Sequence, residues 1–153
     1  MRPILRALTM TIAAAAVGAL VAAGGASASP GGVPAIPLNP EQENPAVDSG
    51  GSGFFTYTVD GDQLCYTLEV RDLTTQPVAA HIHIGPRNVA GPIVVGLTTP
   101  PAQTSTVSAC ITATEGGALT PAELAAIVAD PRSYYVNVHT TRYPGGEIRG
   151  QLK

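Results

Sequence analysis

The stretch FFTYTVDGDQLCYTLEV, residues 54–70, decides the fold class. Two runs of alternating β-forming residues flank Asp60-Gly61-Asp62, and a D-G turn between such runs is a strong signal for a β-hairpin. Further short strand-like runs, separated by turn residues, occupy 36–38, 78–84, 93–97, 105–113, 133–140 and 147–152. This pattern predicts an all-β Greek-key sandwich or barrel of about seven or eight antiparallel strands.

One segment departs from the β pattern. In LTPAELAAIVADP, Thr120 is placed to cap a helix, Pro121 suits the first helical position, and Glu123 completes a capping box. Pro131 ends the helical periodicity. We expect a short helix over residues 121–129 that connects two strands and carries no chemistry.

The first thirty residues, MRPILRALTMTIAAAAVGALVAAGGASASP, have the three parts of a secretory signal. Arg2 and Arg6 precede an apolar run, and Ala26-Ser27-Ala28 fits the cleavage rule. The competing interpretation is an uncleaved anchor, but the apolar run is just short of the roughly 20 residues of a spanning helix. We expect a signal peptide over 1–28, a linker over 29–35, one domain over 36–153, and a secreted chain with no membrane span after cleavage.

Charge excludes one class of partner. Cleavage would remove Arg2 and Arg6 and leave six basic residues against eleven acidic ones. A protein that tracks nucleic-acid phosphates needs the opposite balance. Nucleic acid is therefore not an expected partner.

The two cysteines, Cys65 and Cys110, predict one structural disulfide, because an exported chain meets an oxidising environment. A redox-active pair is the alternative, but the C-x-x-C spacing is lacking. Strand alternation places Cys65 on the other face of its strand from Leu64 and Tyr66. It places Cys110 on the face that holds the polar residues of its own strand. We expect a bridge between neighbouring strands on an outer sheet face.

The chain has three histidines, and two of them stand one residue apart in the strand-like run VAAHIHI. Period-2 geometry puts His81 and His83 on one face, and Ile82 and Ile84 on the face expected to join the core. The same alternation points Asn137 and His139 outward. If the two strands are neighbours, three imidazoles converge on one patch, a ligand set that suits copper or zinc.

The alternative for these histidines is structural. An H-x-H pair often hydrogen-bonds to turn carbonyls and carboxylates. Glu147 and Arg149 alternate with Ile148, so we expect both to point outward as candidate partners. Residues 142–147 predict a tight hairpin turn and no phosphate cradle. No catalytic triad is evident, so no reaction is predicted.

Three stretches resemble the chordin-type domain, called CHRD. They are EQENPAVDSGGSGFFTYTVDGDQLCYTLEV (41–70), AAHIHIGPRNVAGPIVVGL (79–97) and YVNVHTTRYPGGEIRGQL (135–152). The residues that carry the motif are His81, His83, Gly91, Pro92, Asn137, His139, Pro144, Gly145, Gly146, Glu147, Arg149 and Gly150.

This resemblance implies a secreted, non-enzymatic binding or structural module whose partner is an extracellular protein or cell-surface component. In animals such domains are repeated in chordin proteins, which bind growth factors. The present chain has one copy and lacks the accompanying cysteine-rich modules. Growth-factor binding is therefore not carried over.

The histidine pattern is also similar to that of copper/zinc superoxide dismutases, which are Greek-key sandwiches with an H-x-H pair. That similarity implies that His81, His83 and His139 correspond to the three non-bridging copper ligands. A fourth, bridging histidine and a zinc site are lacking, and Glu147 stands where the dismutases have arginine. The similarity thus implies an open three-histidine copper site without efficient superoxide steering.

Overall fold

The computed structural model describes residues 34–153. The predicted signal peptide and residues 29–33 of the predicted linker lie outside the described residues. Within residues 34–153, no helix has the length and apolar character needed to cross a membrane.

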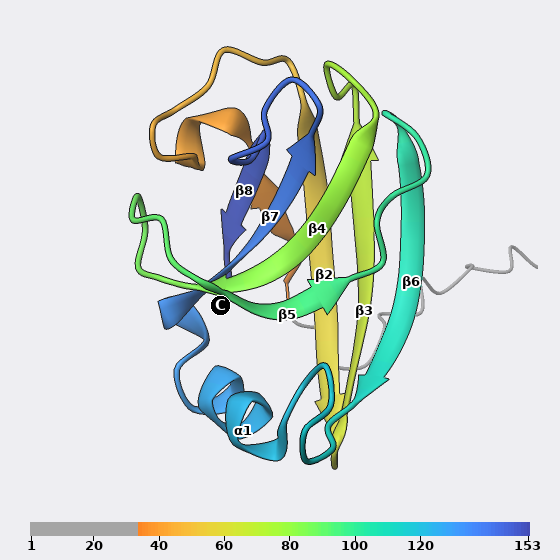
Figure 1. Cartoon of the computed structure of the whole chain (residues 1–153), viewed down its shortest axis with the longest axis vertical. Coiled ribbons are helices and arrows are strands. Elements are labelled where there is room, and N and C mark those ends of the chain that lie inside the picture. The colour runs from red at the N-terminus through yellow and green to blue at the C-terminus, as the bar shows by residue number, and fades with distance from the viewer. Residues whose placement is uncertain (1–33) are drawn as a thin grey trace, which may run out of the picture.

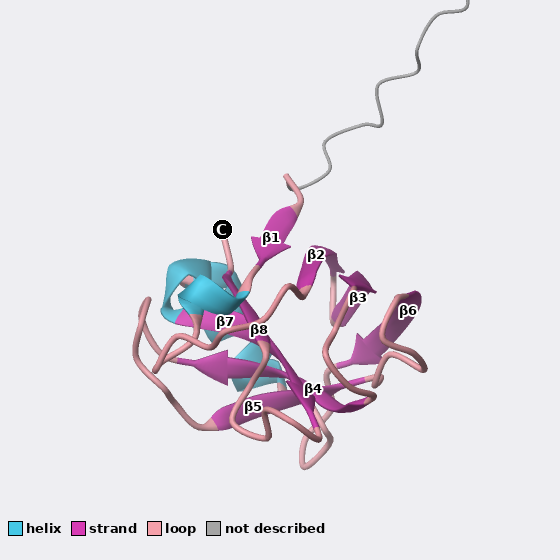
Figure 2. Ribbon diagram, turned by 90° about the horizontal axis from the view of Figure 1, so that it is seen from above, coloured by secondary structure: helices cyan, strands magenta, loops and turns pink. Residues whose placement is uncertain are grey.

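Eight strands form two antiparallel sheets of four strands that face each other (Figures 1 and 2). Sheet A has the spatial order β1 (Ile36–Leu38), β2 (Ser52–Asp60), β3 (Gln63–Arg71) and β6 (Ser105–Thr112). Sheet B has the order β5 (Ile93–Leu97), β4 (Pro77–Ile84), β7 (Tyr134–Thr140) and β8 (Ile148–Gln151). The all-β prediction is confirmed, in the form of a sandwich and not of a closed barrel.

The hairpin predicted around Asp60-Gly61-Asp62 is present. β2 and β3 pair from Ser52 with Arg71 to Asp60 with Gln63, so the turn consists of Gly61 and Asp62. Gly61 has a φ of 59°, a conformation that glycine adopts without strain. The turn chemistry and the alternation of buried side chains therefore agree on one register.

The connections cross between the sheets. β3 pairs with β6, although β4 and β5 intervene in the sequence and belong to the other sheet. The chain crosses again from β6 to β7 through helix α1 (Pro121–Ala129), which lies at one end of the sandwich (Figure 1). These crossings are those of a Greek-key sandwich, as predicted.

Helix α1 begins and ends as the sequence predicts. Thr120 and Glu123 form a complete capping box, in which each side chain bonds the backbone of the other residue. Leu124 and Ile127 are its buried residues. Two short 3-10 helices, η1 (Pro40–Gln42) and η2 (Pro131–Ser133), were not predicted.

The core lies between the two sheets and is built from alternate residues of the strands. Each large apolar side chain removed from water contributes roughly 1.5–3 kcal/mol. One expectation was wrong, because Ile84 is 39% exposed. It is the last residue of β4, at the strand end where the chain turns into the loop that begins at Gly85. The central core residues are Phe55, Leu64, Leu68, Val70, Ile82, Val95, Val136, Val138 and Ile148.

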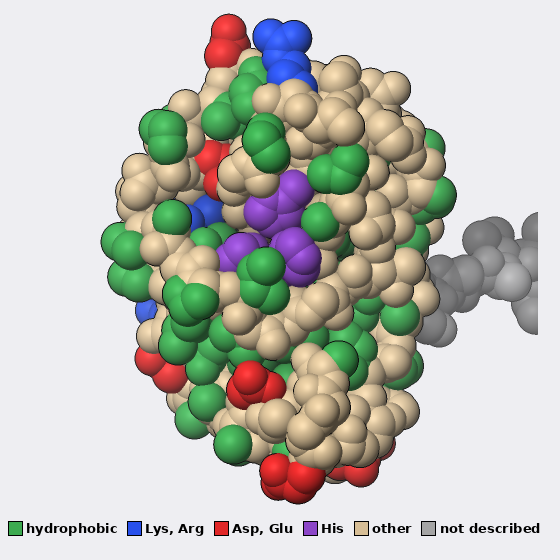
Figure 3. Space-filling model, viewed as in Figure 1, with side chains coloured by type: hydrophobic (Ala, Val, Ile, Leu, Met, Phe, Trp, Pro, Cys, Tyr) green, Lys and Arg blue, Asp and Glu red, His purple; other side chains and the backbone are tan. Residues whose placement is uncertain are grey.

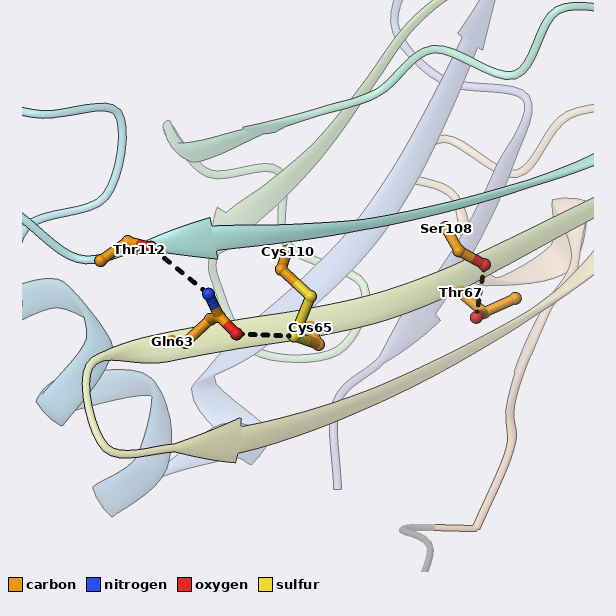
Figure 4. The surroundings of a disulfide bond; sticks show 6 residues. All are labelled: Gln63, Cys65, Thr67, Ser108, Cys110 and Thr112. Atoms are coloured by element: carbon orange, nitrogen blue, oxygen red, sulfur yellow. Dashed lines mark hydrogen bonds between the residues drawn. A yellow bond between two sulfur atoms is a disulfide. The ribbon is translucent and has the colours of Figure 1, made fainter.

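The disulfide between Cys65 and Cys110 is present, with its sulfur atoms 2.06 Å apart. The two cysteines are directly paired in the register of β3 and β6. They lie on the outer face of sheet A, beside the hydrogen-bonded hydroxyls of Thr67 and Ser108 (Figure 4). The prediction of a bridge between neighbouring strands on an outer face is confirmed.

Candidate metal centre

The three histidines gather on the outer face of sheet B (Figure 3). His81 and His83 belong to β4, and His139 belongs to its neighbour β7. In the register of this pair, Ala79 is opposite His139 and His81 is opposite Asn137. Because paired residues share a face, all three imidazoles point away from the core. The adjacency on which the sequence argument depended is therefore met.

The imidazoles are close enough to share one ion. Their nearest ligand atoms all lie within 4.8 Å of one another. The Nδ1 atom of His81 is 3.1 Å from the Nε2 atom of His139. Two imidazole nitrogens that are each about 2 Å from one ion can be at most about 4 Å apart. The 4.8 Å separation exceeds this limit by an amount that small rotations of the imidazole rings would remove.

Hydrogen bonds from loop carbonyls fix the tautomers of two rings. Nδ1 of His83 donates to the carbonyl of Gly91 over 2.9 Å, and Nδ1 of His139 donates to the carbonyl of Pro144 over 3.0 Å. A carbonyl only accepts, so both Nδ1 atoms carry the proton and both Nε2 atoms hold a lone pair when the rings are neutral. Among the described residues, Nε2 of His83 is buried without a hydrogen-bond partner. Carbonyl support of this kind orients metal-ligating histidines.

The third ring, His81, completes the set. Since Nε2 of His139 accepts, Nδ1–H of His81 donates in the metal-free cluster. Binding of an ion through Nδ1 of His81 would require the other neutral tautomer of this ring, with the proton on Nε2. The metal-free cluster thus keeps one ligand pair in contact through a single hydrogen bond.

The imidazoles are neutral at pH 7, as metal ligands must be. Burial lowers the pKa of His81 and of His83 below its ordinary value. Burial, together with the neighbouring His81 and His83, lowers the pKa of His139 to about 4. Protons therefore compete weakly for the cluster at neutral pH.

Two glycines of the motif let the loops approach the histidine strands. A β-carbon on Gly91 would lie 1.7 Å from the carbonyl oxygen of Ile84, so only glycine fits at the residue whose carbonyl holds His83. Gly146 has a φ of 134°, and a β-carbon there would lie 2.4 Å from Oδ1 of Asn137. The loop geometry that supports the histidines explains both positions.

The interpretation of Glu147 and Arg149 as hydrogen-bond partners of the histidines was wrong. Both are buried, at 0% and 2% exposure, and in the described part of the chain neither bonds a histidine. The carboxylate of Glu147 accepts hydrogen bonds from the hydroxyl of Ser49, the amide and hydroxyl of Thr74, and the hydroxyl of Thr140. Burial acts to raise the pKa of Glu147, but these bonds outweigh it and hold the pKa below its ordinary value.

Arg149 instead stacks on an aromatic ring. Its guanidinium carbon is 3.3 Å from the ring centroid of Tyr135, and that ring stacks on His83 with centroids 4.9 Å apart. Its nitrogens donate to the carbonyls of Val89 and Pro86. Sequence reasoning missed Tyr135, although the alternation that placed His139 outward also places Tyr135 on that face.

A second buried contact lies beside the cluster. Nδ2 of Asn137 donates to Oε2 of Glu43 over 3.4 Å, which ties the segment after β1 to sheet B. Burial raises the pKa of Glu43 to about 7, against the opposing effects of Arg149 and Asn137. Glu43 lies in an acidic, proline-rich stretch without strand periodicity, so this contact could not be predicted from the sequence pattern.

Fold and site together define a Greek-key sandwich with a three-histidine cluster on one outer face. The family model of the CHRD domain matches residues 35–152. The chain belongs to the CHRD family. Searches of curated proteins and of solved structures found no match.

Proposed function

We propose that this chain is an exported, non-enzymatic CHRD protein that binds copper through His81, His83 and His139. The observation that carries the proposal is the closeness of the three neutral imidazoles, all within 4.8 Å on one sheet face. Nε2 of His83 adds support, since a buried nitrogen lone pair without a described partner is costly unless a ligand fills it.

Copper is the expected metal ion in preference to zinc for two reasons. Nitrogen ligands bind Cu(II) more tightly than Zn(II) in the general order of divalent affinities. Structural zinc sites almost always have four protein ligands, and the three-ligand zinc sites are catalytic, whereas this cluster offers three ligands and we assign it no reaction. Magnesium and calcium prefer oxygen ligands and fit the cluster poorly.

Export is the second part of the proposal. The N-terminal pattern favours a cleaved signal, and the disulfide between Cys65 and Cys110 suits an oxidising compartment. The expected partner is an extracellular protein or cell-surface component. We assign the protein no reaction.

A purely structural role is the rival account of the histidines. The Nδ1 bonds of His83 and His139 fasten the loops that contain Gly91 and Pro144 to sheet B. If this is their whole role, replacing the histidines lowers the stability of the metal-free protein. In that case added metal does not stabilise the wild-type protein either. If they are ligands, the metal-dependent increment of stability is lost.

The test is a titration of the purified protein, without a histidine tag, with Cu(II) and Zn(II). We expect sub-micromolar affinity for Cu(II), weaker binding of Zn(II), and a sharp loss of affinity in both His81→Ala and His139→Ala. Thr58→Ala is the matched control, because Thr58 is exposed on β2 in the other sheet. Copper affinity that is unchanged by the two histidine substitutions would overturn the proposal.

A further inference from the structure

A buried positive charge lies close to the candidate centre. The guanidinium of Arg149 stacks on the ring of Tyr135, and the other ring in the stack is the imidazole of His83, tilted by only 10° from Tyr135. Because β7 lies between β4 and β8, the three side chains follow one another across sheet B. One aromatic ring therefore separates the cation from a proposed metal ligand.

Among the described residues, this cation has no anion at contact distance. In residues 34–153 the only ion pair joins Arg71 and Glu69. The hydrogen bonds of Arg149 go to neutral oxygens, namely the carbonyls of Pro86 and Val89 and the amide of Gln151. A buried charge without a counter-ion acts at longer range than an exposed one, because water does not screen it.

Glu43 offsets this charge only in part. Among the described residues, it is the carboxyl group whose charge interacts with Arg149, while Arg87 adds a positive charge that acts in the opposite direction. Burial raises the pKa of Glu43 to about 7, so its carboxyl is partly protonated at neutral pH. The balance around the histidines is therefore positive.

The ligands add no negative charge, since three neutral imidazoles replace the thiolate or carboxylate found in many metal sites. A fixed positive charge raises the energy of a bound Cu(II) ion more than that of Cu(I), because the repulsion scales with the charge of the ion. Burial also penalises the higher charge more strongly.

We infer that this centre stabilises Cu(I) relative to Cu(II), and that Arg149 sets the preference by its buried charge. The inference rests on the proposed copper site. The equilibrium is bound Cu(II) plus one electron giving bound Cu(I), with the same three imidazoles as ligands in both states. Arg149 touches no metal ligand directly and acts through Tyr135 as a positioning and electrostatic residue.

The experiment compares the affinities of the purified protein for both oxidation states. Cu(I) is supplied without oxygen, with ascorbate as reductant and bicinchoninate as competitor, and Cu(II) is measured against nitrilotriacetate. The quantity of interest is the Kd for Cu(II) divided by the Kd for Cu(I). In Arg149→Met we expect this ratio to fall at least tenfold, which corresponds to a midpoint potential lower by about 59 mV. Arg149→Lys, which keeps the charge, should retain most of the ratio.

Glu43→Gln tests the same idea from the opposite side and guards against a misfolded Arg149 variant. At pH 8 the wild-type carboxyl is mostly ionised, so its removal should raise the ratio. Arg71→Gln, a cation on the outer face of sheet A, should change nothing. An unchanged ratio in both Arg149→Met and Glu43→Gln would overturn the inference and leave the copper site standing. Binding of neither ion through the histidines would overturn both.

Discussion

Nδ1 of His81 lies 3.1 Å from Nε2 of His139, although the two residues are 58 positions apart in the sequence. The pairing of β4 with β7 brings them together, and the carbonyl of Pro144 fixes which atom of His139 faces His81. The candidate centre is thus part of the sandwich and not an addition to a loop. Its protonation, its stability and its ligand set can each be tested.

The histidine cluster should make the metal-free protein sensitive to acid. The pKa of His139 is about 4 in the fold and about 6.5 in the unfolded chain, so the unfolded state binds more protons between these values. Its contribution to stability is complete above pH 6.5 and is lost as the pH falls towards 4. We expect the free energy of unfolding of the wild type, relative to His139→Gln, to fall by about 2 kcal/mol between pH 7 and pH 4, after allowing for solvent screening.

Urea denaturation at several pH values measures this difference, and the comparison of the wild type with His139→Gln cancels the titrating groups that do not interact with His139. A difference that does not depend on pH would show that His139 is not neutralised by burial in the way described.

Glu43 should have the opposite pH dependence. Its pKa is raised to about 7 in the fold from 4.5, so the stability that its protonated form contributes is present below pH 4.5 and lost as the pH rises through 7. Glu43→Gln keeps the neutral state at every pH. We expect the free energy of unfolding of the variant to exceed that of the wild type by about 2–3 kcal/mol at pH 8 and to match it near pH 4.5. Equal stabilities at pH 8 would contradict the raised pKa.

Glu147 should be important for the stability of the fold, and it should not bind the metal itself. Its carboxylate accepts four hydrogen bonds, from Ser49, Thr74 and Thr140, and is fully buried. In Glu147→Gln an amide group replaces one of the accepting oxygens. We expect a loss of about 2–4 kcal/mol in chemical denaturation. The exposed Glu115 provides the control, since Glu115→Gln should leave stability within about 0.5 kcal/mol of wild type.

The disulfide should stabilise the fold without affecting the metal centre. Cys65 and Cys110 are 45 residues apart, and closing a loop of that length contributes about 4 kcal/mol in the chain-entropy model. The double variant Cys65→Ser/Cys110→Ser should therefore unfold at lower urea concentration. Because the bridge lies on the outer face of sheet A, copper affinity of the folded variant should be unchanged. A loss of copper affinity in that folded protein would contradict the separation of the two features.

Much of the fold could be predicted because its signals are local. The turn at Gly61, the capping box of Thr120 and Glu123, and the alternation along each strand depend on residues close in sequence. The same alternation put His81, His83 and His139 on outward faces. It could not show that β4 and β7 are neighbours, because their pairing depends on how the whole core packs.

The errors have a common physical cause. Glu147 and Arg149 were interpreted as outward-pointing partners of the histidines from their alternation with Ile148 alone. Their burial depends on distant segments that supply hydrogen bonds, such as Ser49 for Glu147 and the carbonyl of Pro86 for Arg149. Ile84 was assigned to the core by alternation alone, which does not show where a strand leaves the sandwich.

The most direct test of the central claim is the number of imidazoles bound to copper. X-ray absorption of the copper-loaded wild-type protein, compared with His83→Ala, measures it. We predict three imidazole nitrogens in the wild type and two in the variant, since Nε2 of His83 is the buried nitrogen without a described partner. Copper held by fewer than three imidazoles in the wild type, or by the same set in both proteins, would contradict the three-histidine centre.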